Sequence, residues 1–444
     1  MGLSKQDFES LGEKILNLVE ADGAQLWLHE TEDLQLRSAN NDITSNGVVD
    51  RFKIGITVNY GKQSASIEIN QSNDEAIREA VKKVQQMAKL APEDPEHLPP
   101  VEPGDYLTPI NFSEATAGMN PEDALKQIRP VIEQGRSAGV DSAGYLERSI
   151  SSSAQINTNG VFIHEQSTGV KFSITARAAE GRGSGWASTQ VTDVSELDLA
   201  AVGDSAIQKA LASRNAKARK AGRTTVVLEA PGVRDLLSIL SWNLGQRNYD
   251  EDRSFLNGLV GEDQELIGNQ IFGENATLYS DPLYEPAPCG VHYYGIPRKK
   301  TMWIEDGVMK NLMVQRFWAQ KNGIDPLPWP GNLIMPGEGK STDELIASVE
   351  DGVLITRLWY LRQVQPQTLL YTGLTRDGTF AIKDGKIDGP VNNFRFNESP
   401  ANVLKNIVAS GKQERVLGSE GDSPMHVPPL VVKDFNLSSV SEAS

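Results

Sequence analysis

Histidine is the residue type in this sequence that would most directly indicate metal chemistry. A catalytic zinc usually takes three protein ligands, and two of them commonly lie close together on one helix. The five histidines are His29, His97, His164, His292 and His426. The closest two along the chain, His97 and His164, are 67 residues apart (164 − 97). No helical pair of histidine ligands is therefore possible, and a zinc site would have to be assembled from distant residues.

Three other patterns could support chemistry, but each favours a plainer interpretation. Cys289 and His292 are three residues apart, a spacing that rarely orients a thiol and a base correctly on a turn or strand. The acidic residues 250–252 could bind a hard cation, although a solvated loop is favoured. The glycine-rich residues 181–185 lack the Gly-Lys-Ser/Thr ending of a phosphate loop, which favours a mobile loop or strand bend.

Composition narrows the class of protein. The chain has 444 residues, 43 basic and 59 acidic side chains and a formal charge of −16, so nucleic acid and phospholipid surfaces would repel it on average. No run approaches the roughly 18 apolar residues that span a bilayer, and charged residues within the first twenty argue against a signal peptide. The single cysteine fits a reducing compartment. We expect a cytoplasmic protein that binds neither nucleic acid nor membrane directly.

The order of predicted elements indicates three units and an α+β fold. Residues 1–90 read as an N-terminal α/β domain with a hairpin turning at 60–62, and residues 91–109 hold six prolines, which indicates a stiff linker. Residues 110–222 repeat a helix–strand–helix order as a central α/β domain. Residues 223–444 predict a larger C-terminal domain rich in antiparallel strands, sandwich-like or barrel-like.

Asparagine–glycine and aspartate–glycine pairs suggest where strands turn. The pairs at 46–47 and 159–160 suit type I′ turns, which need positive φ at both central residues. Asp-Gly pairs at 306–307, 351–352, 377–378, 384–385 and 388–389 each lie between short apolar runs. This series predicts successive hairpins in the C-terminal domain.

Several motifs, in their order and spacing, resemble one family along nearly the whole chain. They lie at residues 183–187 (Gly-Ser-Gly-Trp-Ala), 225–229 leading into 236–237, 253–256, 349–353, 375–378 and 384–396. On these motifs the chain resembles the TldD/PmbA family, and its PmbA branch is also called TldE. The resemblance implies a cytoplasmic assembly in which a TldD-type zinc peptidase pairs with a TldE-type subunit and degrades or processes peptides. In TldD-type members, a helix carries a His-Glu-x-x-x-His motif and a cysteine near the C-terminus supplies a further ligand.

The sequence departs from that active pattern at each zinc position that can be aligned. The corresponding helix, about 233–244, holds Ser238, Ile239 and Asn243, and the C-terminal segment 418–424 has no cysteine. We therefore expect no catalytic residue, no metal ligand and no cofactor in this chain, with zinc only in a TldD-like partner. Whether the chain is itself an enzyme stays open.

The leading hypothesis is a non-catalytic, PmbA/TldE-like subunit. Its expected partners are a TldD-like zinc peptidase or a second copy of itself, and a peptide or unfolded protein as substrate. Asn243, Arg247 and Arg253, around the motif helix, are the residues we expect in a peptide groove. Two alternatives stay open: an active metallopeptidase whose ligands do not align, and a regulatory protein that acts on DNA gyrase or another protein.

Overall fold

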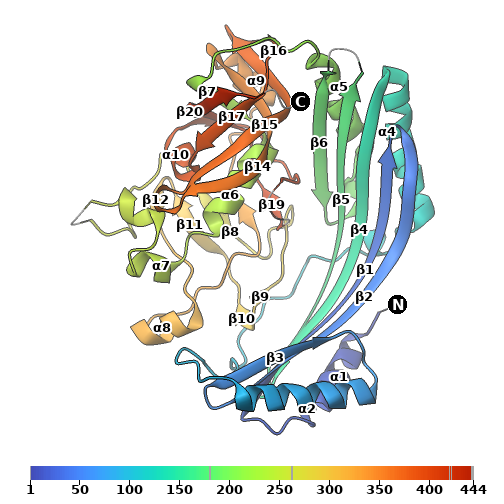
Figure 1. Cartoon of the computed structure of the whole chain (residues 1–444), viewed down its shortest axis with the longest axis vertical. Helices are drawn as coiled ribbons and strands as arrows, with labels where there is room; N and C mark the ends of the chain where they lie inside the picture. The colour runs from blue at the N-terminus through green and yellow to red at the C-terminus, as the bar shows by residue number, and fades with distance from the viewer. Residues whose placement is uncertain (1, 180–181, 262–263, 420, 422, 442–444) are drawn as a thin grey trace.

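A long, curved antiparallel sheet forms one side of the molecule, and a β-rich C-terminal domain forms the other (Figure 1). The structure is a computed structural model that describes residues 2–179, 182–261, 264–419, 421 and 423–441. The predicted α+β fold with a strand-rich C-terminal domain is confirmed. Within the described residues, no helix is both long and apolar enough to cross a membrane.

The curved sheet has six strands in the order β3-β2-β1-β4-β5-β6. The strands are β1 (Gly23–Ala39), β2 (Asp42–Tyr60), β3 (Gln63–Ile69), β4 (Val140–Asn157), β5 (Phe162–Ala178) and β6 (Ser184–Val191). Strands β1 and β4 pair from Gln25↔Asn157 to Ser38↔Gly144. The two predicted α/β units therefore share one sheet, although residues 91–109 separate them in sequence.

Alternation along the strands gives the sheet two different faces. One face is apolar and is covered by helices, because an amphipathic helix must bury its apolar stripe. The helices of this half are α1 (Lys5–Leu16), α2 (Asp74–Leu90), α3 (Glu114–Ala117), α4 (Pro121–Ala138) and α5 (Leu199–Ala212). The other face is polar; on β1 and β4, for example, His29 lies opposite Ser153 and Asp33 opposite Ser149. Glu165 and Ser188, on the same face, contact the C-terminal domain, so this polar face is turned toward it.

The described part of the C-terminal domain combines two larger sheets, a short two-stranded sheet of β9 and β10, and a buried helix. A seven-stranded sheet has the order β14-β7-β20-β17-β15-β16 with β18 paired to β20, and a five-stranded sheet has the order β12-β11-β8-β13-β19. The long strands are β7 (Gly222–Leu228), β14 (Asp351–Gln365), β15 (Leu370–Lys383) and β20 (Leu430–Val440). The shorter strands are β8 (Leu278–Ser280), β9 (His292–Tyr293), β10 (Ile296–Pro297), β11 (Thr301–Glu305), β12 (Val308–Met309), β13 (Leu333–Ile334), β16 (Lys386–Pro390), β17 (Phe394–Glu398), β18 (Ile407–Ser410) and β19 (Met425–His426). The helices are α6 (Ala230–Ser241), α7 (Gln246–Asp250), α8 (Arg316–Asn322), α9 (Thr342–Ala347) and α10 (Pro400–Lys405).

The structure corrects the predicted turn at Asn46–Gly47. These residues lie in the middle of β2, where Gly47 pairs with Gln35 of β1. The chain turns instead at Asn40 and Asn41, with φ of 52° and 56°, because asparagine tolerates the left-handed region and the Asn41 side chain is bonded to Val140 and Ser142.

Only part of the Asp-Gly series forms hairpins. Asp306–Gly307 and Asp384–Gly385 turn with positive φ at both residues, as type I′ geometry requires. The pairs at 351–352, 377–378 and 388–389 lie inside strands β14, β15 and β16 instead. Asp377 and Gly378, also at positive φ, form an irregularity in the β14–β15 pairing and so redirect a strand rather than end it.

Candidate functional site

Helix α6 is the element on which the family resemblance placed the zinc motif, and it is enclosed on every side. All twelve of its residues are buried. It follows directly on β7, packs against β14 and α10, and has proline in its first turn. A helix that is apolar all round belongs in a core, so the two charged residues within it need a specific explanation.

Those two residues, Arg234 and Asp235, bind the helix to the C-terminal segment. Both side chains are fully buried. The backbone N–H of Ser419 donates to Asp235 Oδ1 at 2.7 Å, and Arg234 Nη2 donates to the carbonyl of Ser423 at 3.0 Å. The approach is close, because a Cβ added to Gly418 would lie 2.0 Å from Asp235 Oδ1. Gly418, Ser419 and Ser423 are therefore held directly against the helix.

The three residues at the aligned zinc positions also make contacts within the chain. Ser238 and Ile239 are buried, and the Ser238 carbonyl accepts from Ser241 Oγ at 2.8 Å. Asn243 Nδ2 donates to the carbonyl of Ile239 at 2.8 Å, which closes the last turn of the helix. A Cβ added to Gly421 would lie 3.2 Å from Ser238 Oγ, so Gly421 also lies close to this part of the helix. In the described part of the chain, no three His, Cys, Asp or Glu side chains gather as a metal ion would need; Glu420 and Asp422 lie outside it.

The predicted groove residues lie within α7 and on either side of it, and the two arginines among them are held by carboxylates. Arg247 makes a bidentate pair with Glu96 of the linker at 2.6 and 2.7 Å, and also contacts Glu251 at 3.1 Å. Arg253 binds the same Glu251. Arg247 and Arg253 are thus brought together through Glu251, whereas Asn243 is bonded to its own helix. Their role in a peptide groove stays a prediction.

A buried ion pair joins the curved sheet to the C-terminal domain. Arg357 on β14 donates through Nε to Asp377 Oδ2 at 2.7 Å, and Ser184 on β6 donates to Asp377 Oδ1 at 2.5 Å. The Arg357 guanidinium lies 4.5 Å from the ring centre of Trp186 and 5.0 Å from that of Trp359, within cation–π range. Burial lowers the pKa of Arg357, and the Asp377 carboxylate opposes that shift.

Sequence reasoning missed the residues that make these contacts. The available signals were an Arg-Asp pair inside an otherwise apolar helix and an aspartate–glycine pair within a strand. The Arg-Asp pair was interpreted only as part of an altered zinc helix, and the aspartate–glycine pair was interpreted as a turn.

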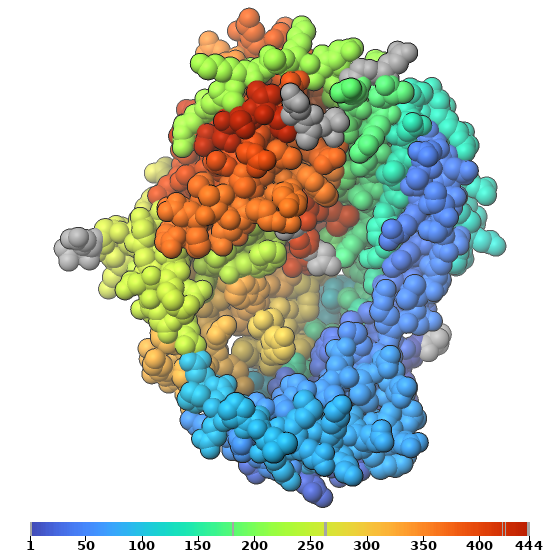
Figure 2. Space-filling view, viewed as in Figure 1, coloured from blue at the N-terminus to red at the C-terminus, as the bar shows by residue number. Residues whose placement is uncertain are grey.

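Figure 2 shows a hollow on the front of the molecule, between the curved sheet and the C-terminal domain. The β14–β15 hairpin overhangs it from the C-terminal domain, and β1 and β2 border it on the other side. Half of β14 lies in this overhang. Gly352 to Ile355 pair with β7, whereas the strand beyond them pairs, among the strands that the structure describes, with β15 alone. Trp359 and Tyr360 of this part are exposed to solvent, as is Trp242 beside α6. Exposed rings and a strand edge without a neighbouring strand are features that bind extended peptides. On this edge the Leu358 carbonyl already accepts from Ser419 Oγ at 2.8 Å.

A second junction between the two halves lies near Glu414. Lys209 on α5 pairs with Glu229, the residue before α6, at 2.6 Å. Glu414 is still accessible to solvent, yet the surrounding protein and the nearby Glu229 carboxylate raise its pKa to about 7. The carboxyl therefore titrates near neutrality.

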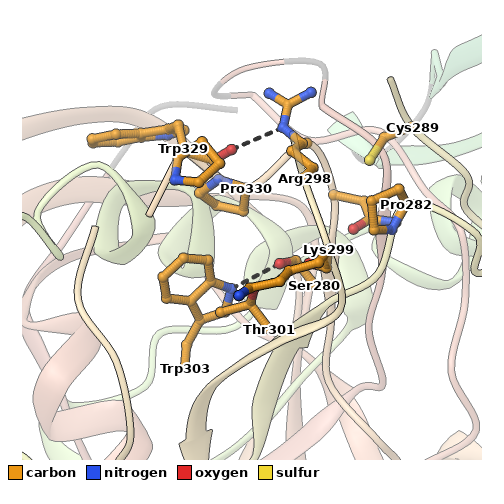
Figure 3. Close-up of a pocket in the computed structure, with 12 residues that line it drawn as sticks. Ser280, Pro282, Cys289, Arg298, Lys299, Thr301, Trp303, Trp329 and Pro330 are labelled. Atoms are coloured by element: carbon orange, nitrogen blue, oxygen red, sulfur yellow. Dashed lines mark hydrogen bonds between the residues drawn. The ribbon is translucent and has the colours of Figure 1, made fainter. Parts of the chain in front are cut away.

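Figure 3 shows Cys289 near Arg298 and Pro282 on one side of a small cavity, with the Trp303 and Trp329 rings on the other side. The cavity there has a volume of about 10 Å³, room for roughly one water molecule. Burial raises the pKa of the thiol to about 12, which leaves almost no thiolate at neutral pH. His292 bonds instead to Glu165, with its Nε2 atom 3.2 Å from the carboxylate. A Cys289–His292 nucleophile pair is therefore not formed.

Comparison with solved structures shows proteins of the same fold. Solved structures with the same fold include TldE from Thermococcus kodakarensis, with a TM-score of 0.85 and 17% identity over 98% of this chain and 99% of that one. A protein from Bacteroides thetaiotaomicron described as a candidate modulator of DNA gyrase gives a TM-score of 0.86 and 18% identity over 99% of this chain and 100% of that one. At such identities the likeness establishes the fold alone.

Sequence comparison establishes the family. Three PmbA/TldA metallopeptidase models match in order: domain 1 at residues 25–88, the central domain at 113–214 and the C-terminal domain at 221–439. The chain belongs to the PmbA/TldD family. Among curated relatives, a protein named metalloprotease from Methanothermobacter thermautotrophicus is 26% identical over 74% of this chain and 76% of its own length. An uncharacterised protein of Methanocaldococcus jannaschii is 28% identical over 70% of this chain and 72% of its own.

Proposed function

We propose that this chain is a TldE-like subunit that does not hydrolyse peptides itself and acts with a TldD-like zinc peptidase in the cytoplasm. The observation that best supports the proposal is the set of residue types at the aligned zinc-ligand positions on and next to α6. A zinc hydrolase must offer a metal nitrogen, sulfur or carboxylate ligands and leave one coordination position open for water. Here the aligned positions hold a serine, an isoleucine and an asparagine, and the adjacent segment lies directly against the helix.

The buried pair Arg234–Asp235 supports a structural role for the helix. Asp235 is the carboxylate on α6, but its Oδ1 accepts the Ser419 N–H, and Arg234 is next to it in sequence. The buried Asp235 oxygen that accepts this N–H is committed to a contact within the chain, as buried polar groups generally are.

The work of such a subunit would be to hold substrate. The polar face of the curved sheet and the overhanging β14–β15 hairpin border the hollow, and the outer half of β14 has one strand neighbour. An extended peptide could add to that edge through main-chain hydrogen bonds, which give affinity with little demand on sequence. Asn243, Arg247 and Arg253 are the proposed flanking contacts.

The proposal is tested by peptide hydrolysis with purified proteins. The chain is assayed alone, with a homologue that carries the His-Glu-x-x-x-His motif, and with that homologue after its motif Glu is changed to Gln. We expect no chelator-sensitive cleavage by the chain alone and with the Glu→Gln homologue, and cleavage with the intact homologue that exceeds the homologue's own rate. Chelator-sensitive cleavage by the chain alone would favour the active-peptidase alternative.

A further inference from the structure

One short segment of the chain connects the edges of the two large sheets, between β6 and β14 (Figure 1). Strand β6 is the last strand of the curved sheet, and among the strands that the structure describes it pairs with β5 alone. The outer half of β14 likewise has β15 as its one described neighbour. Residues 415–419 (Arg-Val-Leu-Gly-Ser), which we call the bridging segment, contact both edges. They therefore lie where an extended peptide would enter between the two sheets.

The bridging segment is bonded to β6 through the groups that an added strand would use. The Gln190 N–H donates to the carbonyl of Arg415 at 3.2 Å, a main-chain bond of the kind that edge strands offer. The backbone N–H of Leu417 donates to Ser188 Oγ at 3.0 Å, and Ser188 Oγ donates to the Leu417 carbonyl at 3.3 Å. The segment thus occupies polar groups of this edge without forming a regular ladder.

The other end of the bridging segment closes the inner part of the β14 edge. Ser419 Oγ donates to the carbonyl of Leu358 at 2.8 Å, and the Ser419 N–H donates to Asp235 Oδ1 at 2.7 Å. Beyond Leu358, the residues of β14 are exposed from Trp359 onward, apart from Leu361. A peptide that extended along this edge toward α6 would meet Ser419.

Few bonds hold the bridging segment, and its surface is only partly covered. Val416 is the one buried residue of the five, and the other four are partly exposed. The Arg415 side chain anchors the beginning of the segment, because it donates to Thr192 Oγ1 at 2.8 Å and to the carbonyl of Pro286 at 3.2 Å. Segments with few buried apolar contacts and solvated hydrogen bonds open locally at a small cost in free energy. Another extended chain can therefore take the place of this one at the same edges.

We propose that the bridging segment competes with substrate: an extended peptide binds between β6 and β14 by displacing residues 415–419. This inference rests on the proposed function and deepens it, because it names what regulates the same edge. Only molecules in which the segment is displaced can bind, so the apparent dissociation constant is the intrinsic constant divided by the displaced fraction. Loosening the segment should tighten peptide binding, and fixing the segment in place should weaken it.

The first test loosens the bridging segment from its own side, so that both strand edges stay intact. Arg415→Ala removes the bonds to Thr192 and Pro286, and Ser419→Ala removes the hydroxyl bond to Leu358. Binding of a short, uncharged, unstructured peptide labelled with fluorescein is measured by anisotropy on the full chain. We expect the double variant to bind roughly tenfold more tightly than the unchanged chain, because each lost hydrogen bond favours the displaced state.

Arg223→Ala combined with Ser438→Ala is the matched control. The Arg223 guanidinium and the Ser438 hydroxyl also donate to backbone carbonyls, but to those of Asp434 on β20 and Arg395 on β17. This control should bind the peptide as the unchanged chain does. Equal or weaker binding by the loosened variant overturns the displacement of the segment and leaves peptide binding itself in place. If no form binds the peptide, substrate holding fails as well, and the inference fails with it.

The second test fixes the bridging segment with a disulfide. The bonds between Ser188 Oγ and the backbone of Leu417 place the two Cα atoms within about 7 Å of each other, a distance that a disulfide can span. Ser188→Cys with Leu417→Cys should therefore form an intrachain bond, and the native Cys289 is buried. The oxidised protein should bind the peptide roughly tenfold more weakly than the same protein after reduction. Equal affinity in the two redox states overturns the proposal, and so does failure of the two thiols to join, which would place the segment away from β6 in solution.

Discussion

Replacing Asp377 by asparagine should loosen the junction between the curved sheet and the C-terminal domain. The carboxylate is 1% exposed and bonds to Arg357, whose side chain is 12% exposed, and to Ser184. Breaking a buried pair by removing one partner costs about 3–5 kcal/mol, because the other charge is left desolvated. Arg357 keeps its contacts with Trp186 and Trp359. We therefore expect a loss at the lower end, about 3 kcal/mol.

Asparagine isolates the electrostatic effect from the backbone effect. Asp377 has φ of 56°, a region that asparagine tolerates and alanine does not. Asp384→Asn is the matched control, because Asp384 has φ of 50° in an exposed hairpin turn. Surface changes of this kind stay within about 0.5 kcal/mol.

Equilibrium denaturant unfolding, followed by fluorescence, measures both variants. Adding Arg357→Met completes a double-mutant cycle, in which the coupling energy between the two side chains should be about 2 kcal/mol. If Asp377→Asn is no less stable than Asp384→Asn, the pair does not hold the two halves together and this reasoning is wrong.

Three further predictions follow from the site. Glu414→Gln should raise the free energy of unfolding at pH 8 by about 1 kcal/mol after solvent screening and leave it unchanged at pH 5. A carboxyl whose pKa is raised to about 7 in the folded state is stabilising while protonated, and this contribution is lost as the pH rises from the unfolded-state pKa through 7. Thermal melts at a series of pH values measure the difference. Gly418→Ala should destabilise the chain by about 1–3 kcal/mol and speed proteolysis of the C-terminal segment, whereas Gly169→Ala, which meets its nearest atom at 3.7 Å, should do neither. Arg253→Ala should weaken peptide binding, measured by fluorescence anisotropy, without changing the melting temperature. Arg247→Ala should weaken binding and also lower the melting temperature, because the substitution breaks the ion pair with Glu96 of the linker. Unchanged peptide binding in both variants would show that these residues do not line the groove.

Local signals predicted the helices well because their caps act over a few residues. The Asn120-Pro121 start gives α4, whose N-cap side chain accepts from two backbone N–H groups, and the Tyr60–Lys62 turn joins β2 to β3. The ends of elements are harder to predict: α10 ends at Lys405, and β18 begins only two residues later, at Ile407. Ends of elements depend on tertiary contacts, which a local pattern does not contain.

Turns were the weaker prediction because a turn residue serves equally well inside a strand. Asn46–Gly47 has the composition of a type I′ turn, yet the paired edges of β1 and β2 continue through it. Asp377–Gly378 has the φ values of a turn, but its carboxylate is the centre of a junction between segments far apart in sequence. No local pattern reveals that Ser184, Arg357 and Asp377 meet.

In the candidate site, too, features within a short stretch of sequence could be predicted, whereas contacts between distant residues could not. The positions on α6 that correspond to the zinc ligands could be predicted by alignment to the family motif, because the motif is short and lies on one helix. The contact of Asp235 with Ser419 joins residues 184 positions apart and became visible only in the structure. Family membership was predicted from the order of the motifs along the chain, and three matching domain models confirm it.

The central claim, that this chain holds no catalytic metal, is tested most directly by its zinc content. The purified chain is incubated with excess zinc, dialysed extensively and measured by inductively coupled plasma mass spectrometry, with a zinc-motif homologue treated in parallel. We expect well under one zinc ion per chain in this protein and about one per chain in the homologue. One zinc per chain retained here, and lost when a histidine is changed to alanine, would contradict it.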